Sequence, residues 1–414
     1  MVTFAALKLL PMSDLSMAPP RTALKSKRIV SIDLLRGIVM ILMVLDHVRD
    51  YFHAYSYQYD SLDLDHTTVP IFFTRWITHF CAPIFMFLSG ISAFLYGEKR
   101  SRKELSWFLF TRGLWLVFAE LFIVSFEWTF DPFYHIYILQ VIWAFGICMI
   151  VLSAFIWLDR RLLLLIGILL IGGHNLLDNI HVAGNGPAAL GWSFLHDQRF
   201  FSFGHSTFLV GYPIIPWIGI IVTGYCFGNL YSPQFDPVKR RKTLLSVGLG
   251  AIVLFILLRF SNLYGDPFPW SVQRNGVFTV LSFIKVLKYP PSLLYILVTL
   301  GPALIFLSLA EGKLNAITEK ISTFGRVPMF YYLIHIFFIH LLAVAAVVAQ
   351  GHKWSDMVVQ TWVTSSPELK GYGFSLPVVY AIWLGTVILL YPLCAWYDRY
   401  KRAHQARNRW LSYL

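Results

Sequence analysis

Charged side chains are scarce in this sequence. Asp, Glu, Lys and Arg make up 14% of its 414 residues, whereas soluble domains carry roughly 25%. Hydrophobic side chains make up 57%, and the mean hydropathy is +0.62. The composition excludes a soluble globular protein. It indicates an all-α fold, a polytopic integral membrane bundle of helices with the lipid bilayer as its surroundings.

Cysteine is also scarce, and its spacing follows no pattern. The four cysteines lie far apart within apolar runs, at Cys81, Cys148, Cys226 and Cys394. They therefore predict no disulfide framework, and we expect no metal site. Fixed-period repeats and low-complexity linkers are lacking too. We expect a flexible cytoplasmic tail at 1–27, one transmembrane domain at 28–400 and a basic cytoplasmic tail at 401–414.

Apolar runs long enough to cross a bilayer, which takes about 20 helical residues, recur along the chain. The ten candidates are 31–53, 70–97, 105–128, 134–157, 161–177, 205–231, 243–263, 290–310, 325–349 and 375–397. Lys and Arg accumulate in cytoplasmic loops, so alternate connections should differ in basic content. One side holds 23 of the 34 basic residues, the other side holds seven, and four lie inside the runs. This alternation predicts about ten transmembrane helices with both termini in the cytoplasm.

The net charge of +12 comes from short basic clusters that flank the apolar runs. Clusters in this position are typical of contact with anionic lipid head groups. We therefore expect no nucleic-acid partner.

The first apolar run carries ionisable residues on one face. Asp33, Arg36 and His47 follow steps of three and four through Met40 and Met43, so they share one side of a helix. An ionisable group at the centre of a membrane span costs roughly 2.5 to 3.5 kcal/mol, so it is seldom there for packing alone. The alternative is structural, with Asp33 and Arg36 neutralising each other at the interface. The whole stripe favours a catalytic role within the membrane over the structural alternative.

The second run repeats this pattern. Arg75 and His79 lie one helical turn apart, and Pro83 has no N–H to donate to the carbonyl of His79. A freed carbonyl beside an imidazole makes a polar pocket at membrane depth. The alternative is a buried histidine that a neighbouring helix satisfies. Tyr331 and His335, one turn apart in the ninth run, are further residues that can point into the bundle.

Three motifs, in this order, resemble a known family. They are Ser31-Ile-Asp33-Leu-Leu-Arg36-Gly37 leading to His47, Ala82-Pro83-Ile-Phe-Met-Phe-Leu-Ser-Gly90, and Gly325-Arg326-Val-Pro328 leading to Tyr331 and His335. Together they are similar to the catalytic region of heparan-α-glucosaminide N-acetyltransferase and its bacterial relatives. The opening motif also resembles the wider group of membrane acyltransferases that modify cell-surface glycans.

The resemblance implies transfer of an acetyl or other acyl group from cytoplasmic acetyl-CoA to a saccharide or amino-sugar acceptor across the membrane. It implies an integral protein of the bacterial inner membrane, and it leaves a homo-oligomer open. Arg36 would bind the anionic part of CoA, with Asp33 orienting it. A histidine would act as base or acyl carrier.

Three histidines compete for that role. His47 is the first choice, His79 the second and His66 the third; the family is thought to use a histidine in its first luminal loop, where this chain offers His66 at 54–69. Asp46, Arg75, His335 and Tyr331 are expected to be supporting polar residues. Asp46 is adjacent to His47 and points elsewhere, so we expect it to support His53 or a loop.

A rival interpretation from another class is a proton-coupled secondary transporter. Intramembrane Asp, Glu, Arg and His also build proton relays, and the Gly- and Pro-interrupted stretch 212–228 is reminiscent of a broken helix. The lack of a visible two-fold repeat counts against it. A noncatalytic scaffold would leave the charged stripe unexplained.

Overall fold

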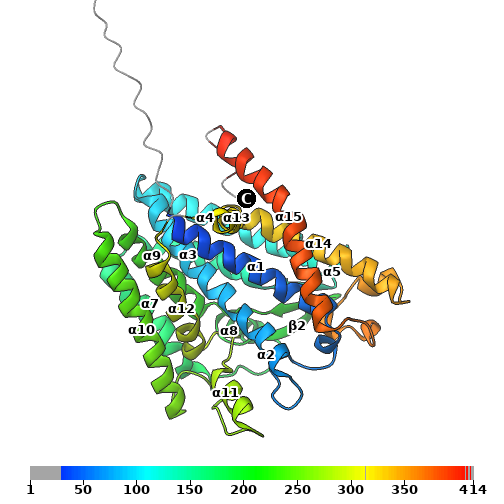
Figure 1. Cartoon of the computed structure of the whole chain (residues 1–414). Coiled ribbons are helices and arrows are strands. Elements are labelled where there is room, and N and C mark those ends of the chain that lie inside the picture. The colour runs from blue at the N-terminus through cyan, green and yellow to red at the C-terminus, as the bar shows by residue number, and fades with distance from the viewer. Residues whose placement is uncertain (1–28, 313, 406, 409–410, 412–414) are drawn as a thin grey trace, which may run out of the picture.

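The computed structural model describes residues 29–312, 314–405, 407–408 and 411. About 70% of the structure is helical (Figure 1). The fifteen α-helices are α1 Val30–Phe52, α2 Val69–Trp76, α3 Cys81–Gly97, α4 Arg102–Phe118, α5 Ser125–Thr129, α6 Val141–Phe155, α7 Arg160–Gly173, α8 Pro187–Leu195, α9 Ile215–Phe227, α10 Pro237–Ser261, α11 Gly276–Ile284, α12 Leu293–Leu309, α13 Ala316–Arg326, α14 Pro328–Ala349 and α15 Leu376–His404. The expected tail at 1–27 lies outside the described residues, and α15 runs past the expected boundary at residue 400.

Shorter turns link several of these helices. The 3-10 turns are η1 Ala54–Tyr57, η2 Ile77–Phe80, η4 His174–Leu177, η5 Gly228–Tyr231, η6 Trp354–Met357, η7 Val363–Ser365 and η8 Pro367–Leu369, and η3 Ala119–Val124 is a π-helical segment. The turn η2 joins α2 to α3, and η3 joins α4 to α5, so each of these pairs forms one continuous helical stretch. A π segment within a helix is a frequent feature of functional sites.

Six helical stretches in the described part of the chain are long and apolar enough to cross a membrane. They are Val69–Gly97, Arg102–Thr129, Arg160–Leu177, Pro237–Ser261, Pro328–Ala349 and Leu376–His404. The helices α6, α9 and α12 are apolar but shorter, and α1 carries charged residues at both ends. The structure therefore supports an integral membrane protein, while ten spans and cytoplasmic termini stay predictions.

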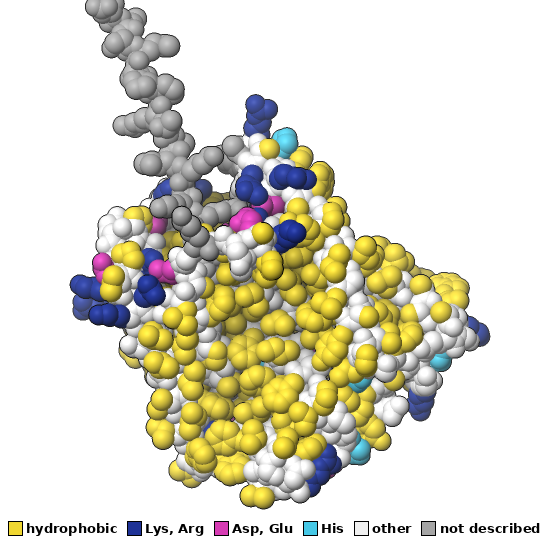
Figure 2. All heavy atoms as spheres, in the orientation of Figure 1, with side chains coloured by type: hydrophobic (Ala, Val, Ile, Leu, Met, Phe, Trp, Pro, Cys, Tyr) yellow, Lys and Arg dark blue, Asp and Glu magenta, His cyan; other side chains and the backbone are white. Residues whose placement is uncertain are grey.

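Hydrophobic side chains cover the middle of the face shown in Figure 2, and Lys and Arg gather at its upper edge beside the C-terminal part of α15. Such an apolar band with basic side chains at its border is what a bilayer requires.

A small sheet corrects the all-α prediction. Strands β1 Ile136–Leu139, β2 Arg199–Phe203 and β3 Ser206–Val210 form a three-stranded sheet in the order β1-β3-β2. β1 and β3 are parallel, and β2 and β3 are antiparallel. The apolar runs at 134–157 and 205–231 therefore begin with strands, because a short apolar run does not by itself distinguish strand from buried helix.

Helix α1 lies within the bundle and packs against α3, α13, α14 and α15 (Figure 1). Its closest approach is to α13, where a Cβ on Gly37 would lie 2.1 Å from the carbonyl oxygen of Ile321. A Cβ on Gly325 would in turn lie 2.0 Å from the carbonyl oxygen of Asp33. Small residues let membrane helices approach backbone to backbone. The two motif glycines therefore fix α1 against α13.

The motif Gly325-Arg326-Val-Pro328 spans a junction, since α13 ends at Arg326 and α14 begins at Pro328. Arg326 lies 2.8 Å from Asp398 of α15 and 3.0 Å from Glu319 of α13. These contacts make Arg326 a structural residue that holds the end of α13 against α15.

Candidate functional site

One cavity of about 870 Å³ runs through the bundle beside α1. Helices α1 to α6 and α14, the turns η1, η2 and η7, strands β2 and β3 and several loops supply its walls. Arg36 and His47 both line it. They are 11 residues apart on α1, which corresponds to about 16 Å along the helix axis. Arg36 and His47 of the predicted stripe therefore face a shared cavity, whose volume is within the range of ligand sites.

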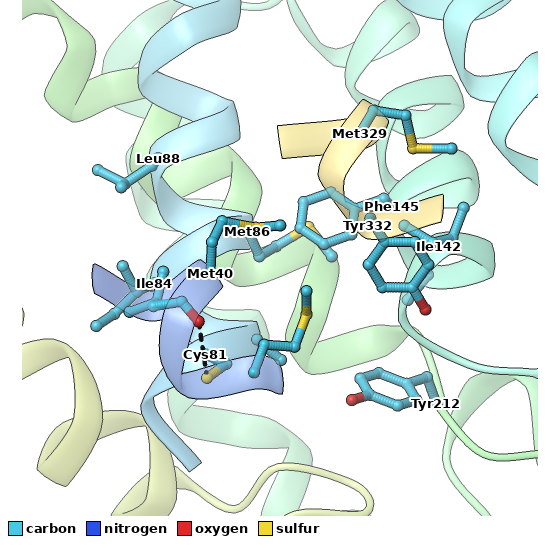
Figure 3. Close-up of a cluster of buried hydrophobic side chains, with 14 of the residues drawn as sticks. Met40, Cys81, Ile84, Met86, Leu88, Ile142, Phe145, Tyr212, Met329 and Tyr332 are labelled. Carbon is cyan, nitrogen blue, oxygen red and sulfur yellow. Dashed lines mark hydrogen bonds between the residues drawn. The ribbon is translucent and has the colours of Figure 1, made fainter. Parts of the chain in front are cut away.

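The middle of the cavity has apolar walls. Met40 of α1, Phe145 of α6, and Met329 and Tyr332 of α14 all line it, and Figure 3 shows these side chains meeting from different helices. Cys81 also lines the cavity and donates a hydrogen bond to the carbonyl oxygen of Val39, 3.3 Å away. An apolar passage of this kind excludes water from any reaction inside it.

Arg36 is held firmly at one end of the lining. Its guanidinium donates to Ser92 Oγ at 2.8 Å and to the carbonyl oxygen of Gly325 at 3.2 Å. Asp33 lies 3.5 Å from it, as the spacing predicts, but does not itself line the cavity. Arg112 of α4 also lines the cavity. Guanidinium groups in the lining make the cavity attractive to an anion.

His47 forms a pair with His335 of α14. His47 Nδ1 and His335 Nε2 lie 2.8 Å apart, and His335 Nδ1 lies 2.8 Å from the carbonyl oxygen of Tyr331. A carbonyl only accepts, so His335 Nδ1 carries the proton, and the neutral ring then offers Nε2 as an acceptor. His47 must donate from Nδ1 to that acceptor. Its Nε2 is left with a free lone pair, which is what a general base or nucleophile requires.

Trp128 and Tyr332 surround His47. Their ring centroids lie 4.9 Å and 6.3 Å from that of His47, both in edge-on arrangements. Both side chains are buried and line the cavity. Neither Trp128 Nε1 nor the Tyr332 hydroxyl has a hydrogen-bond partner of good geometry among the described residues, although the two side chains are close enough to interact with each other. An N–H and an O–H donor without firm partners beside a histidine suit a developing oxyanion.

The sequence did not single out either donor. Trp128 ends an apolar run, a position that is typical of an interfacial aromatic belt, yet it is only 1% exposed. The π segment η3 lies between α4 and α5, and Glu120 within it accepts hydrogen bonds from the backbone amides of Gln140 and Trp143. This contact holds α5, with Trp128, against the start of α6. Tyr331 was predicted instead of its neighbour, but only Tyr332 lines the cavity.

Asp46 occupies a buried ionic cluster beside His47. Both of its carboxylate oxygens accept from Arg75, at 2.6 and 2.7 Å, and Arg49 lies 2.9 Å away. Thr78 donates to it at 2.9 Å. Asp46, Arg49 and Arg75 all line the cavity. Asp46 was expected to support His53 or a loop; its carboxylate contacts Arg49, Arg75 and Thr78 instead of His53.

His79 and His66 lie apart from this arrangement. His79 is buried, and neither ring nitrogen has a hydrogen-bond partner among the described residues. Its carbonyl accepts from the Tyr295 hydroxyl at 2.7 Å, which confirms that Pro83 leaves this oxygen free for another helix. Neither His79 nor His66 lines the cavity.

His66 sits in the loop before α2 with half of its side chain exposed. It lies 2.8 Å from Asp63 and stacks on Tyr59 at 4.1 Å. Its hydrogen bond holds the pKa of Asp63 below its usual range. The geometry favours His47 among the three histidines, and the catalytic role of each remains a prediction.

The opposite end of the cavity is formed by polar and aromatic loop residues. They are Gln58, Tyr59, Asp60, Ser61, Trp362, Thr364 and Ser365. Gln198, Arg199 and Phe200, at the start of β2, line it as well. Hydroxyl, amide and aromatic groups together are suited to a polar small molecule.

Comparison with known families gives one match. The family model described as heparan-alpha-glucosaminide N-acetyltransferase, catalytic, matches residues 28–260, which is more than half of the chain. The matched part contains Arg36, His47 and Trp128, whereas α14 with His335 lies beyond it. No curated protein matches the chain.

Proposed function

This chain belongs to the heparan-alpha-glucosaminide N-acetyltransferase catalytic family, and on that premise we propose that it transfers an acyl group from cytoplasmic acetyl-CoA to an extracytoplasmic saccharide. The family establishes an acetyltransferase-like membrane enzyme. The donor, the acceptor and the roles of individual residues are our proposal. The observation that carries it is the shared cavity between Arg36 and His47.

The donor fits the separation between these two residues. CoA carries its phosphates at one end and its thioester at the other, with the pantetheine arm between them. Arg36 and Arg112 would bind the anionic end. The apolar middle of the cavity, at Met40 and Phe145, would hold the arm. The thioester would then reach His47, and the order of groups along the cavity matches the order along the donor.

The transfer step uses the free lone pair of His47. Nε2 takes the proton from an acceptor hydroxyl or amine as that group attacks the thioester carbon. Trp128 Nε1–H and the Tyr332 hydroxyl donate to the oxyanion of the tetrahedral intermediate. The carbon–sulfur bond breaks, and the proton on His47 passes to the departing CoA thiolate. A variant in which Nε2 itself takes the acyl group first needs the same lone pair.

An amino sugar or another saccharide suits the opposite end of the cavity, the acceptor mouth, which the polar and aromatic loop residues form. Asp60 adds a negative charge there, beside the hydroxyls of Ser61 and Ser365 and the ring of Tyr59. A carboxylate attracts an amino group, and hydroxyl side chains can both donate to and accept from sugar hydroxyls. We place this mouth on the outer side of a bacterial inner membrane, in keeping with the distribution of basic residues.

Transfer of label tests the proposal. Purified protein in lipid nanodiscs is incubated with acetyl-CoA labelled in the acetyl group and with a panel of hexosamines and neutral sugars. We expect label on an acceptor and stoichiometric release of CoA in wild type. His47→Ala should lose the transfer, whereas the matched control His352→Ala, whose ring lies outside the cavity lining, should keep it. Retention of full activity by His47→Ala would reject His47 as the base.

Proton-coupled transport remains the second candidate, and the buried cluster of Asp46, Arg49 and Arg75 is the observation that favours it. Intramembrane charge pairs of this kind also serve proton relays. Gradient-dependent uptake of a solute into proteoliposomes, with no release of CoA, would support transport over acyl transfer.

A further inference from the structure

Two histidines and an aspartate meet at the end of α7, away from the cavity. His174 and Asp178 belong to the turn η4 and the residue after it, and His196 follows α8 directly. One ligand atom from each residue lies within 4.8 Å of the other two. We propose that His174, Asp178 and His196 bind a zinc-class divalent cation, a site that neither the family match nor the sequence pattern predicts.

The distances and donor types suit such an ion. His196 Nε2 and Asp178 Oδ1 lie 3.6 Å apart. Two ligands at about 2.1 Å from a tetrahedral zinc ion are about 3.4 Å apart. Two imidazoles with one carboxylate form a frequent zinc donor set and leave a fourth position for water. The histidine pair selects against calcium and magnesium, which prefer oxygen.

His174 supplies a second, independent observation. Its side chain is 2% exposed, and neither ring nitrogen has a hydrogen-bond partner of good geometry among the described residues. The Pro291 carbonyl is the one backbone acceptor that interacts with the ring, so the second ring nitrogen keeps a buried lone pair. A buried polar atom without a partner costs free energy, and such atoms in native proteins call for an explanation. A bound cation provides one, because it accepts the lone pair that the surroundings leave unused.

The neighbouring residues orient the other two ligands. Asn175 Nδ2 donates to Asp178 Oδ2 at 2.8 Å, which turns the other oxygen, Oδ1, toward His196. The amide oxygen of Asn175 accepts from the backbone of Leu293 at 2.9 Å, so α12 fixes the whole group. Contacts that hold a metal ligand in orientation are typical of real metal sites. His196 Nε2 lies 2.7 Å from the His174 carbonyl oxygen; it donates there when the ion is absent, and the neutral ring carries its proton on Nδ1 when the ion binds Nε2.

The site reaches the proposed acceptor mouth through a short segment. Gln198 and Arg199 line the cavity, only two and three residues after His196. A metal that joins the end of α7 to His196 would fix the start of β2 at this mouth. This consequence rests on the proposed function, whereas metal binding itself does not.

Metal content of the purified protein tests the proposal. The protein is expressed with a tag that lacks histidine, dialysed without chelator, and measured by inductively coupled plasma mass spectrometry. We expect about one zinc per chain in wild type and less than a tenth of that in Asp178→Asn and His174→Ala. His181→Ala removes a histidine from an exposed His–Asp pair in the same region, 3.2 Å from Asp197, and should keep the metal.

Titration of wild-type protein covers the case in which these variants fail to fold. After treatment with a zinc chelator, the thermal unfolding midpoint should fall by several degrees and should return on addition of zinc chloride, but not of magnesium chloride. The proposal is overturned if wild type holds no stoichiometric metal and zinc leaves its midpoint unchanged. It is overturned equally if Asp178→Asn folds and binds zinc as wild type does. Transfer activity is not part of either readout, so failure of this proposal leaves the acyltransferase assignment to its own test.

Discussion

At the scale of single residues, the protonation pattern around His47 is set by one backbone carbonyl. Tyr331 accepts from His335, His335 accepts from His47, and His47 keeps its lone pair. The stripe of Asp33, Arg36 and His47 was predictable, because helical periodicity and the cost of intramembrane charge both point to it. The partner His335, 288 residues away, was predicted only as an inward-facing residue, since sequence spacing carries no information on contacts between distant helices.

Loss of the histidine pair gives the first residue-scale prediction. His335→Ala should lower kcat about 10-fold to 100-fold and leave KM for acetyl-CoA within about twofold, because His335 orients the base without touching the donor. His47→Ala should lower kcat by roughly 100-fold to 10,000-fold, the range for removal of a general base. Steady-state kinetics on both variants separate the two roles. Equal losses in the two variants would contradict a purely positioning role for His335.

The two donors beside His47, Trp128 Nε1–H and the Tyr332 hydroxyl, give the second residue-scale prediction. Trp128→Phe and Tyr332→Phe keep an aromatic ring and remove the N–H or O–H, so each should lower kcat by up to about 100-fold to 1,000-fold, as for a lost oxyanion donor. Tyr331→Phe is the matched control, since its hydroxyl is buried off the cavity lining. It should stay within about threefold of wild type. Wild-type rates in both Trp128→Phe and Tyr332→Phe would reject the oxyanion role.

At the scale of elements, hydropathy located the long helices well and the short elements badly. Every predicted apolar run contains a helix, but other elements were missed: the strands β1 to β3, the short helices α8, α11 and α13, and the π segment η3. A strand of four or five residues contains too few alternations of side chains to be recognised from the sequence. A π segment within a helix has no hydrophobic periodicity of its own. Trp128 lies in α5, directly after that segment, so hydropathy alone does not reveal that its side chain is buried.

Contact between α1 and α13 gives the prediction at this scale. Gly37→Ala should destabilise the protein by about 1 to 3 kcal/mol, the usual cost of overpacking, because the new methyl group meets the Ile321 carbonyl. Gly250→Ala, in α10, is the matched control, since nothing lies within 4 Å of its Cβ position. It should be neutral or stabilising by up to about 1 kcal/mol. Thermal unfolding in detergent compares the two, and equal midpoints would contradict the close approach.

At the scale of the whole molecule, the charge distribution and the cavity together predict a protein whose two membrane faces have different roles. Basic clusters define the predicted cytoplasmic side, Arg36 lines the cavity end expected there, and the polar loops line the other end. Composition alone predicted the membrane class, and the family resemblance predicted the chemistry. The continuity of the cavity was not predictable, because it depends on how helices far apart in sequence pack together.

Sidedness gives the prediction at this scale. Single cysteines placed at Ser365 and at Lys242, in a background with the four native cysteines replaced by serine or alanine, should label from opposite sides in inside-out and right-side-out membrane vesicles. Ser365 should react with a membrane-impermeant maleimide from the periplasmic side and Lys242 from the cytoplasmic side. Labelling of both positions from the same side would contradict the predicted orientation and the transmembrane transfer built on it.

The most direct measurement is a cryo-electron microscopy map of His47→Ala protein in nanodiscs with saturating acetyl-CoA, a variant expected to hold the donor without turnover. We expect the phosphate groups beside Arg36 and Arg112, the pantetheine arm past Met40, and the thioester carbonyl near Trp128 Nε1 and the Tyr332 hydroxyl. Acetyl-CoA bound outside this cavity, or lying with its thioester toward Arg36, would contradict the central claim that donor and base meet at His47.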